Sequence, residues 1–151
     1  MAPQKRIGLA RALSKLGYCS RSRASTLIRA GRVAFNGRIT RDPESAVRMQ
    51  NGRIGDQITV DGTLVGRMPA VYLIMNKPRG VVTTASDEKG RKTVYDLLDA
   101  ALPWVGPVGR LDKASEGLLL LTNDSEWAAS ITDPASHLDK KYHVQVDCIV
   151  R

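Results

Sequence analysis

Asp112 is the carboxylate whose sequence neighbours best suit chemistry. It follows Arg110 in a predicted loop, directly before the apolar run at residues 117–122. A carboxylate beside a guanidinium stays ionised, which suits a nucleophile or a base rather than a general acid. From the residues alone, the commoner alternatives for such an aspartate are a turn cap and a surface ion pair.

Other catalytic patterns are missing from the sequence. No second carboxylate lies at a convincing fixed offset from Asp112, as a glycosidase-like acid pair would require. There is no Ser-His-Asp pattern, no Walker loop and no nucleotide-binding glycine motif. Cys19 and Cys148 lie far apart without a CxxC pair, so we expect reduced structural thiols and no zinc or other metal site.

The second group of chemistry-bearing residues is a concentration of arginine. Residues 1–67 contain thirteen Lys and Arg against four Asp and Glu, whereas residues 68–151 contain ten against eleven. Eleven of the thirteen are arginine, whose planar fork suits bidentate contact with phosphate. This asymmetry favours a polyanionic partner. The uncharged apolar runs are too short to span a membrane, so we expect a cytoplasmic protein with no membrane partner.

Two predicted helices carry these arginines. Apolar spacing predicts one helix over residues 5–17. A second helix is predicted to begin after a cap at Ser20 or Ser22 and to end at Gly31. The polar side of this second helix and its exit loop hold four arginines: Arg21, Arg23, Arg29 and Arg32.

A small sheet is predicted to follow the two helices. Asn36-Gly37 lies between alternating segments and predicts a β-hairpin, because a type I′ turn needs two residues at positive φ. Residues 55–62 predict one more short strand between turns. Residues 64–70 break the periodicity where the charge balance changes, so we expect a linker there and a first domain over residues 5–63.

The second domain, residues 71–151, is predicted to mix strands and short helices. The run at 71–75 is typical of a buried strand, and the run at 117–122 of a central strand. The remaining predicted elements are a return strand at 81–83, a short helix at 93–98, a helix from Asn123-Asp124 through Ile131, and a half-exposed strand at 141–146. The predicted fold class is therefore α+β, with a mixed or antiparallel sheet in the second domain.

Five short motifs stand out in residues 5–62: Leu13-x-x-Leu16-Gly17, Ser20-Arg21-Ser22-Arg23-Ala24, Ile28-x-x-Gly31-x-Val33, Asn36-Gly37 and Gly55-Asp56. With these motifs, the order of elements resembles the alpha-L RNA-binding fold of a small-subunit ribosomal protein, tyrosyl-tRNA synthetases and several RNA-modifying enzymes. The resemblance implies that the second helix and its exit loop face structured RNA, with Arg21, Arg23, Arg29 and Arg32 as the contact candidates. Such contacts recognise phosphates and RNA shape more than base sequence. For each arginine the alternative is a solvated helix face.

Residues 109–124, GRLDKASEGLLLLTND, resemble the signature of the RsuA-like ribosomal RNA pseudouridine synthases. Two flanking segments agree with this resemblance, LIMNKPRG at 73–80 and KKYHV at 140–144. The alpha-L fold is the usual N-terminal partner of that family. The resemblance therefore covers nearly the whole chain.

This resemblance implies the roles of three residues. Asp112 matches the catalytic aspartate, Tyr142 a tyrosine expected to stack on the target uracil, and Arg110 an arginine suited to the space left by the flipped uridine. Lys77 and Lys140 are weaker matches, interpreted as structural or near phosphates. No cofactor is implied, because the uridine is isomerised without redox change. The implied partner is ribosomal RNA or a ribosomal assembly intermediate, and we expect a monomer.

The family's catalytic fold continues beyond the Lys-x-Tyr strand with further strands and a basic residue that pairs with the aspartate. We therefore expect the catalytic domain in this sequence to be incomplete at its C-terminal end. The alternative function is a non-catalytic RNA-binding or ribosome-associated protein that uses only the basic domain. A DNA-binding helix-turn-helix protein is a weaker interpretation, because the second helix offers mainly phosphate-type arginines rather than base-reading side chains.

Overall fold

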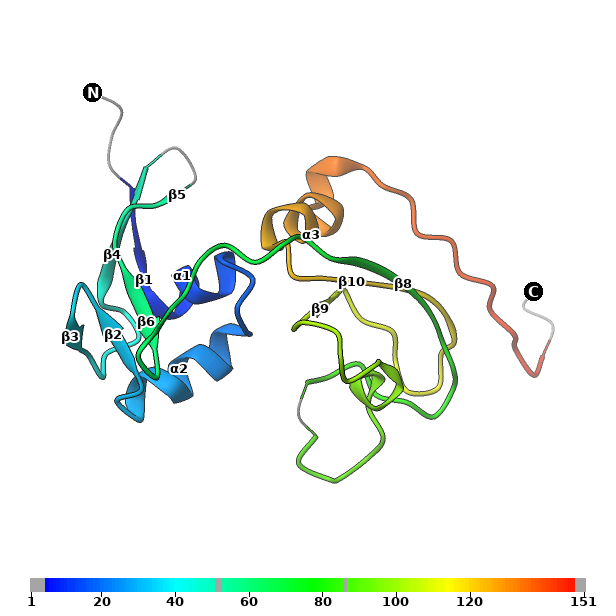
Figure 1. The fold of residues 1–151 in the computed structure, drawn as a ribbon. Helices are drawn as coiled ribbons and strands as arrows, with labels where there is room; N and C mark the ends of the chain where they lie inside the picture. The colour runs from blue at the N-terminus through cyan, green and yellow to red at the C-terminus, as the bar shows by residue number, and fades with distance from the viewer. Residues whose placement is uncertain (1–4, 51–52, 86, 149–151) are drawn as a thin grey trace.

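The computed structural model describes residues 5–50, 53–85 and 87–148, whose elements fall into two groups (Figure 1). The N-terminal group comprises β1 (Lys5–Gly8), α1 (Leu9–Lys15), α2 (Arg21–Arg29), β2 (Val33–Phe35), β3 (Arg38–Ile39), β4 (Ala46–Gln50), β5 (Arg53–Ile54), β6 (Ile58–Val60) and β7 (Thr63–Leu64). The C-terminal group comprises β8 (Tyr72–Lys77), the 3-10 helix η1 (Val94–Leu97), β9 (Gly106–Val108), β10 (Gly117–Thr122), α3 (Ser125–Thr132) and the 3-10 helix η2 (Pro134–Ser136). The predicted α+β class is confirmed.

The N-terminal group packs its two helices with two antiparallel sheets, β1-β4-β5 and β3-β2-β6-β7. Thirteen buried apolar residues form one core between them, and Leu13 and Ile28 are completely buried there. As predicted, Ser20 caps α2, since its hydroxyl accepts a hydrogen bond from the Arg23 backbone N–H at 3.1 Å. The cap fixes where the arginine-bearing helix begins.

The hairpin predicted at Asn36-Gly37 is confirmed. Asn36 and Gly37 adopt φ angles of 49° and 79°, as a type I′ turn requires, and join β2 to β3. The turn reverses the chain immediately after the α2 exit loop. The sequence therefore determined both the helix start and the hairpin through local backbone preferences.

The helix predicted over residues 5–17 is wrong in its first part. Residues Lys5–Gly8 form strand β1, and the helix covers only Leu9–Lys15. β1 pairs antiparallel with β4, with Ile7 opposite Val47. β4 was not predicted, and its ladder pairs all four residues of β1 with Ala46, Val47, Arg48 and Met49. The apolar spacing of Ile7 and Leu9 suits a strand as well as a helix.

The C-terminal group is built on one antiparallel sheet of order β8-β10-β9. The predicted central strand is confirmed as β10, which pairs with β8 and with β9. Helix α3 begins where predicted, because the Asp124 carboxylate accepts the backbone N–H groups of Glu126 and Trp127. No helix in the described part of the chain is long and apolar enough to cross a bilayer.

Three predictions for the C-terminal group are wrong. The strand at 71–75 is not buried, because β8 alternates and leaves the Ile74 side chain on an open face at 77% exposure. Residues 81–83 form no return strand, and Val82 makes only one isolated parallel bridge, to Thr93. Residues 141–146 form no strand, since no ladder partner exists for them among the described residues. This last segment runs away from the sheet (Figure 1).

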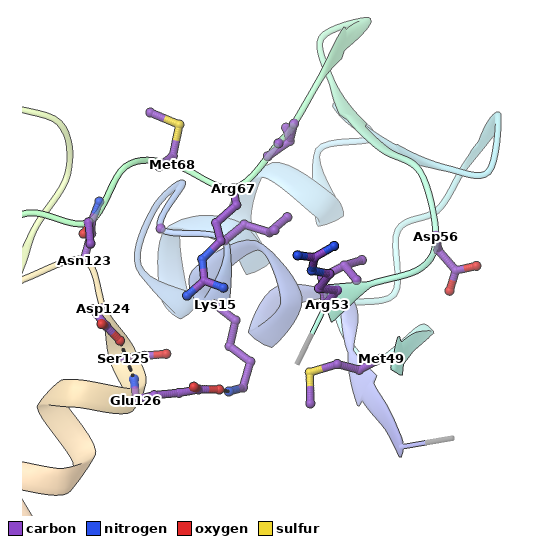
Figure 2. Close-up of a pocket in the computed structure, with 16 residues that line it drawn as sticks. Lys15, Met49, Arg53, Asp56, Arg67, Met68, Asn123, Asp124, Ser125 and Glu126 are labelled. Carbon is purple, nitrogen blue, oxygen red and sulfur yellow. Dashed lines mark hydrogen bonds and ion pairs between the residues drawn. The ribbon is translucent and has the colours of Figure 1, made fainter. Parts of the chain in front are cut away.

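The predicted linker, residues 64–70, is bonded to both groups. Leu64 belongs to strand β7, and the Met68 backbone N–H donates to the Leu16 carbonyl at the end of α1, at 2.8 Å. From the other side, the buried Asn123 amide donates to the Pro69 carbonyl at 2.9 Å. Figure 2 shows Met68 on this segment and Asn123 next to it. Long-range hydrogen bonds thus connect the linker to both groups.

Candidate active site and RNA-binding surface

The loop that carries Asp112 joins β9 to β10 and begins and ends at glycines. Gly109 and Gly117 have φ angles of 76° and 127°, which a side chain would strain. Between them, the Leu111 side chain packs against the C-terminal core while the neighbouring Asp112 is exposed. The Asp112 carbonyl accepts the Ser115 N–H at 3.0 Å, which closes a turn. The loop therefore buries one side chain and presents the next one to solvent.

A buried lysine holds the far end of this loop. Lys77, the last residue of β8, is completely buried, and its ammonium donates to the carbonyl oxygens of Pro78 at 2.9 Å and Ser115 at 2.7 Å. Burial lowers the pKa of Lys77, and the carboxylates of Asp112 and Glu116 partly oppose that decrease. The negative charge of Asp112 therefore acts on a buried cation in the fold.

Residues after β8 hold the loop at two further points. The Thr83 hydroxyl donates to the Leu111 carbonyl at 2.8 Å, and the Gly80 N–H donates to the Lys113 carbonyl at 2.7 Å. With the Ser115 carbonyl bound by Lys77, alternate carbonyls of the loop are fixed. Fixing the main chain on both sides of Asp112 limits where its carboxylate can move, which is the structural requirement for a preorganised catalytic group.

Arg110 is exposed beside Asp112 in the sequence but not bonded to it. Within the described residues, no ion pair within 4.0 Å joins the two side chains. The expected guanidinium contact with Asp112 is thus absent from the described structure, while the Asp112 carboxylate opposes the lowering of the Lys77 pKa by burial. Arg79 and Glu116 pair nearby at 3.5 Å, but both are well exposed, so this pair adds little stability.

Tyr142 lies in the extended segment that follows η2. Its side chain is 65% exposed. Across the described ranges, no hydrogen bond or ring contact joins it to the loop of Asp112. The structure therefore brings Asp112, Arg110 and Lys77 to one region and leaves Tyr142 apart from them.

The predicted RNA contacts lie on α2 and its exit loop. Arg21, Arg23 and Arg29 are all exposed on the helix, opposite the buried face formed by Ala24, Leu27 and Ile28. Their charge is thus available to a partner. The burial of the apolar face against α1 and the sheets decides which side of the helix the arginines occupy.

Arg32 differs from the other three arginines because it has an internal partner. Its guanidinium donates through Nε to Asp61 Oδ1 at 2.9 Å and makes a second contact with Oδ2. The hydrogen bond to Asp61 raises the pKa of Arg32 and lowers that of Asp61. Arg32 can contact a phosphate only by sharing or leaving this carboxylate.

The structure adds three residues whose importance the sequence analysis underrated: Lys77, Thr83 and Asn123. Lys77 occupies the same side of β8 as Leu73 and Met75, so its inward direction could have been inferred from the strand period. No sequence signal marks the long-range bonds of Thr83 or Asn123. Over the described residues, no three His, Cys, Asp or Glu side chains gather as a metal site would need.

Comparison with known proteins gives matches to two families. Residues 71–150 match the RNA pseudouridylate synthase family, and residues 7–52 match the S4 domain. The second match covers α1, α2 and the strands β2, β3 and β4 of the N-terminal group. The order of the two families is the order expected from the sequence.

Individual relatives agree with these matches. The chain is 40% identical to the ribosomal large subunit pseudouridine synthase B of Bacillus subtilis, over 91% of this chain and 54% of that protein. It is 43% identical to an uncharacterized RNA pseudouridine synthase of Rickettsia conorii, over 91% of this chain and 57% of that protein. A crystal structure of a pseudouridylate synthase aligns with a TM-score of 0.47 at 30% identity, over 87% of this chain and 54% of that one.

The chain spans about half the length of the curated relatives it matches. The match to the RNA pseudouridylate synthase family nevertheless covers more than half of this chain. It includes β8, β10 and the loop that carries Asp112. The resemblance inferred from the motifs at residues 73–80, 109–124 and 140–144 is therefore confirmed. This chain belongs to the RNA pseudouridylate synthase family.

Proposed function

We propose that this chain isomerises a specific uridine of ribosomal RNA to pseudouridine, with Asp112 as the catalytic residue. The observation that carries the proposal is the exposed Asp112 on a loop whose main chain is fixed at Leu111, Lys113 and Ser115. Family membership supplies the reaction. The name of the Bacillus subtilis relative favours the large ribosomal subunit as the source of the RNA.

The reaction needs one carboxylate and no external reactant. The glycosidic bond between ribose C1′ and uracil N1 breaks, the base rotates, and a bond forms from C1′ to C5, while C5 loses a proton and N1 gains one. The Asp112 carboxylate can add to the sugar or base, or take a proton from the ribose. Its exposure allows either role, because a flipped uridine must reach it from solvent.

We propose supporting roles for the remaining residues. Arg110 occupies the space left by the flipped uridine, and Tyr142, whose side chain is exposed, stacks on the uracil. Arg21, Arg23, Arg29 and Arg32 hold the RNA by its phosphates. We also infer a first domain over residues 5–63, a linker over 64–70 and a catalytic domain over 71–151, of which 149–151 lie outside the described residues.

The protein is proposed to act as a cytoplasmic monomer. Its partner is then ribosomal RNA or a ribosomal assembly intermediate, consistent with the S4 match and with the arginines exposed on α2. The charge asymmetry between residues 1–67 and 68–151 supports RNA delivery by the N-terminal group.

The test is an isomerisation assay on ribosomal transcripts of both subunits, read by mass spectrometry of isotope-labelled uridine. We expect the chain to form pseudouridine, and Asp112→Asn to abolish this while RNA affinity is retained. The control is Asp99→Asn, an exposed aspartate whose capping bond to the Ala101 N–H an asparagine can keep. RNA binding with no isomerisation by the unmodified chain would contradict the proposed catalysis and favour the non-catalytic alternative.

A further inference from the structure

A hollow of about 430 Å³ lies between the two groups and belongs to none of the residues proposed for catalysis. It is bounded by the end of α1, by β5, by the linker and by the start of α3 (Figure 2). Its size is in the range of pockets that hold small organic molecules. Because residues of both groups line it, an occupant would contact the RNA-binding and the catalytic group at once.

One part of the wall is apolar. Leu16, Met49, Ile54, Val65 and Met68 contribute to it, and none of these side chains is aromatic. All except Met68 also pack against the N-terminal core, so this part of the wall is held rigidly. A flat, weakly polar group such as a nucleobase could lie against it, with burial rather than ring stacking as the source of affinity.

The carboxylates in the lining are already occupied by other parts of the protein. Glu126 accepts the Lys15 ammonium at 2.8 Å. Asp124 accepts the first N–H groups of α3 and, at 2.8 Å, the Tyr72 hydroxyl. The charge of Glu126 is thus compensated by Lys15, whereas Asp124 is hydrogen-bonded only by neutral donors and keeps its negative charge.

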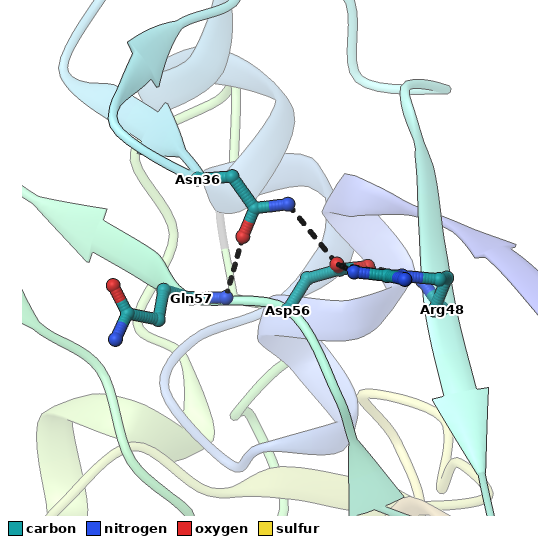
Figure 3. Close-up of polar contacts among 4 residues, drawn as sticks. All are labelled: Asn36, Arg48, Asp56 and Gln57. Carbon is teal, nitrogen blue, oxygen red and sulfur yellow. Dashed lines mark hydrogen bonds and ion pairs between the residues drawn. The ribbon is translucent and has the colours of Figure 1, made fainter.

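The third lining carboxylate, Asp56, is bound most completely (Figure 3). It accepts the Arg48 guanidinium at 2.9 and 3.0 Å, the Arg48 backbone N–H at 2.6 Å and the Asn36 amide at 3.0 Å. Burial alone would raise its pKa, but these hydrogen bonds outweigh burial and hold the pKa below its ordinary value. Asn36 in turn accepts the Gln57 N–H at 2.9 Å. Asp56 thus acts as an internal brace.

The arginines in the lining have no such partners. Arg53 on β5 and Arg67 on the linker are exposed, and the side chain of neither makes a hydrogen bond or ion pair with any residue in the described ranges. Arg67 interacts with Asp124 and Glu126 only through longer-range electrostatics. Asp56 and Glu126 are paired with Arg48 and Lys15, so Arg53 and Arg67 are balanced only by Asp124. The remaining charge around the hollow is therefore positive, which favours an anionic occupant.

We propose that this junction pocket binds a single unpaired nucleotide of the RNA, with its base against the apolar wall and its flanking phosphates on Arg53 and Arg67. The assignment rests on the proposed RNA substrate and adds to it a second recognition point away from Asp112. Unpaired nucleotides are the parts of structured RNA whose bases are accessible to a protein pocket. Such a contact would also set the two groups at a fixed distance along the RNA.

The test uses a fluorescein-labelled RNA stem-loop with one bulged nucleotide and the same stem-loop without the bulge. Binding is followed by fluorescence anisotropy on the Asp112→Asn chain, so that turnover cannot alter the probe. We expect a preference for the bulged RNA, and about a tenfold loss of affinity for it in Arg53→Gln and in Arg67→Gln, typical of one charged hydrogen bond. Arg38→Gln, an exposed arginine of β3 outside the pocket, removes the same charge as the matched control.

A second readout reports the base itself. With 2-aminopurine at the bulge, binding should not quench the fluorescence of this base, because the pocket lining contains no aromatic ring that could stack on it. Equal affinity for the two RNAs, or equal losses in all three arginine variants, would overturn the pocket while leaving the proposed isomerisation intact. Absence of any RNA binding would overturn both proposals.

Discussion

The two groups of this chain are stabilised in different ways. The N-terminal group buries thirteen apolar residues in one cluster, whereas the C-terminal group buries five. Conversely, of the six polar residues that are buried in the described structure, four belong to the C-terminal group: Lys77, Thr83, Thr122 and Asn123. The first group is thus held mainly by apolar packing, and the second relies more on specific long-range hydrogen bonds.

This difference matches what each group presents. The N-terminal group keeps its arginines on the outside of a well-packed helix, where only the packing of the opposite face matters. The C-terminal group must hold an irregular loop with an exposed carboxylate, and apolar contacts alone do not fix the path of a loop. Its sheet also has an open face among the described residues, where Ile74 and Leu118 are 77% and 67% exposed.

The largest expected effect compares the two cores by the same substitution. Leu13→Ala and Leu121→Ala each remove a completely buried leucine, and we expect each to lower the free energy of unfolding by about 2–5 kcal/mol. Both tryptophans, Trp104 and Trp127, lie in the C-terminal group, so tryptophan fluorescence reports that group alone while circular dichroism reports both.

In urea titrations, Leu121→Ala should shift the fluorescence midpoint, and Leu13→Ala only the dichroism midpoint. Leu64→Ala, at an exposed leucine of β7, serves as the control. It should change the free energy of unfolding by no more than about 0.5 kcal/mol in either signal. Identical shifts of both signals in both core variants would mean that the groups unfold as one unit, and the comparison would fail.

The second prediction concerns the polar ties of the C-terminal group. Lys77→Met keeps the length of the side chain but leaves the Pro78 and Ser115 carbonyls without their donor. This should lower the free energy of unfolding by about 1–3 kcal/mol, mainly at the half-buried Ser115. The fluorescence midpoint should fall, and so should isomerisation, because the loop of Asp112 loses a fixed point. Lys113→Met, exposed in the same loop, is the matched control. If Lys77→Met kept the unmodified fluorescence midpoint and the unmodified isomerisation activity, the proposed role of Lys77 in holding the Asp112 loop would be wrong.

The third prediction tests the polar brace of the N-terminal group by pH. Because the folded-state pKa of Asp56 is below its ordinary value of 3.8, its ionised form stabilises the fold above that value. This contribution is lost as the pH falls through the folded pKa. Asp56→Asn should therefore lower stability by about 1–3 kcal/mol near neutral pH and lose its effect in acid. If Asp56→Asn lost the same stability in acid as near neutral pH, the ionised carboxylate of Asp56 would not be the stabilising form.

The smallest expected effect on stability concerns the ion pair that joins the two groups. Lys15 and Glu126 form an ion pair at 2.8 Å, but the Glu126 side chain is 68% exposed. A double-mutant cycle with Lys15→Ala and Glu126→Ala should give a coupling energy of about 0.2–1 kcal/mol that decreases with added salt. A larger, salt-independent coupling would show that the groups are locked together rather than weakly joined.

Local signals predicted much of the N-terminal group and the helix starts of both groups. Ser20, Asn36-Gly37 and Asp124 each act on backbone within three residues of themselves, so a short sequence window contains the whole cause. The failures all involve partners far along the chain. The β1 strand needs β4, and residues 141–146 alternate like a strand but have no ladder partner in the described structure.

For the candidate site, the sequence identified Asp112 and Arg110 by their motif and placed both in a loop before the strand at 117–122. The sequence did not indicate that the Asp112 carboxylate would act electrostatically on the buried Lys77 without forming an ion pair with Arg110. The reason is that Lys77 reaches the loop only through the pairing of β8 with β10, which brings residue 77 opposite residue 117.

The sequence by itself determined the family, the uneven distribution of charge and the local turns and caps, because each depends on residue types in short windows. The tertiary structure alone decided which carbonyls hold the loop of Asp112, which face of the second sheet stays open, and that a hollow with two uncommitted arginines lies between the groups. These features arise from contacts between segments dozens of residues apart. Such contacts form only when burial and strand pairing bring the segments together.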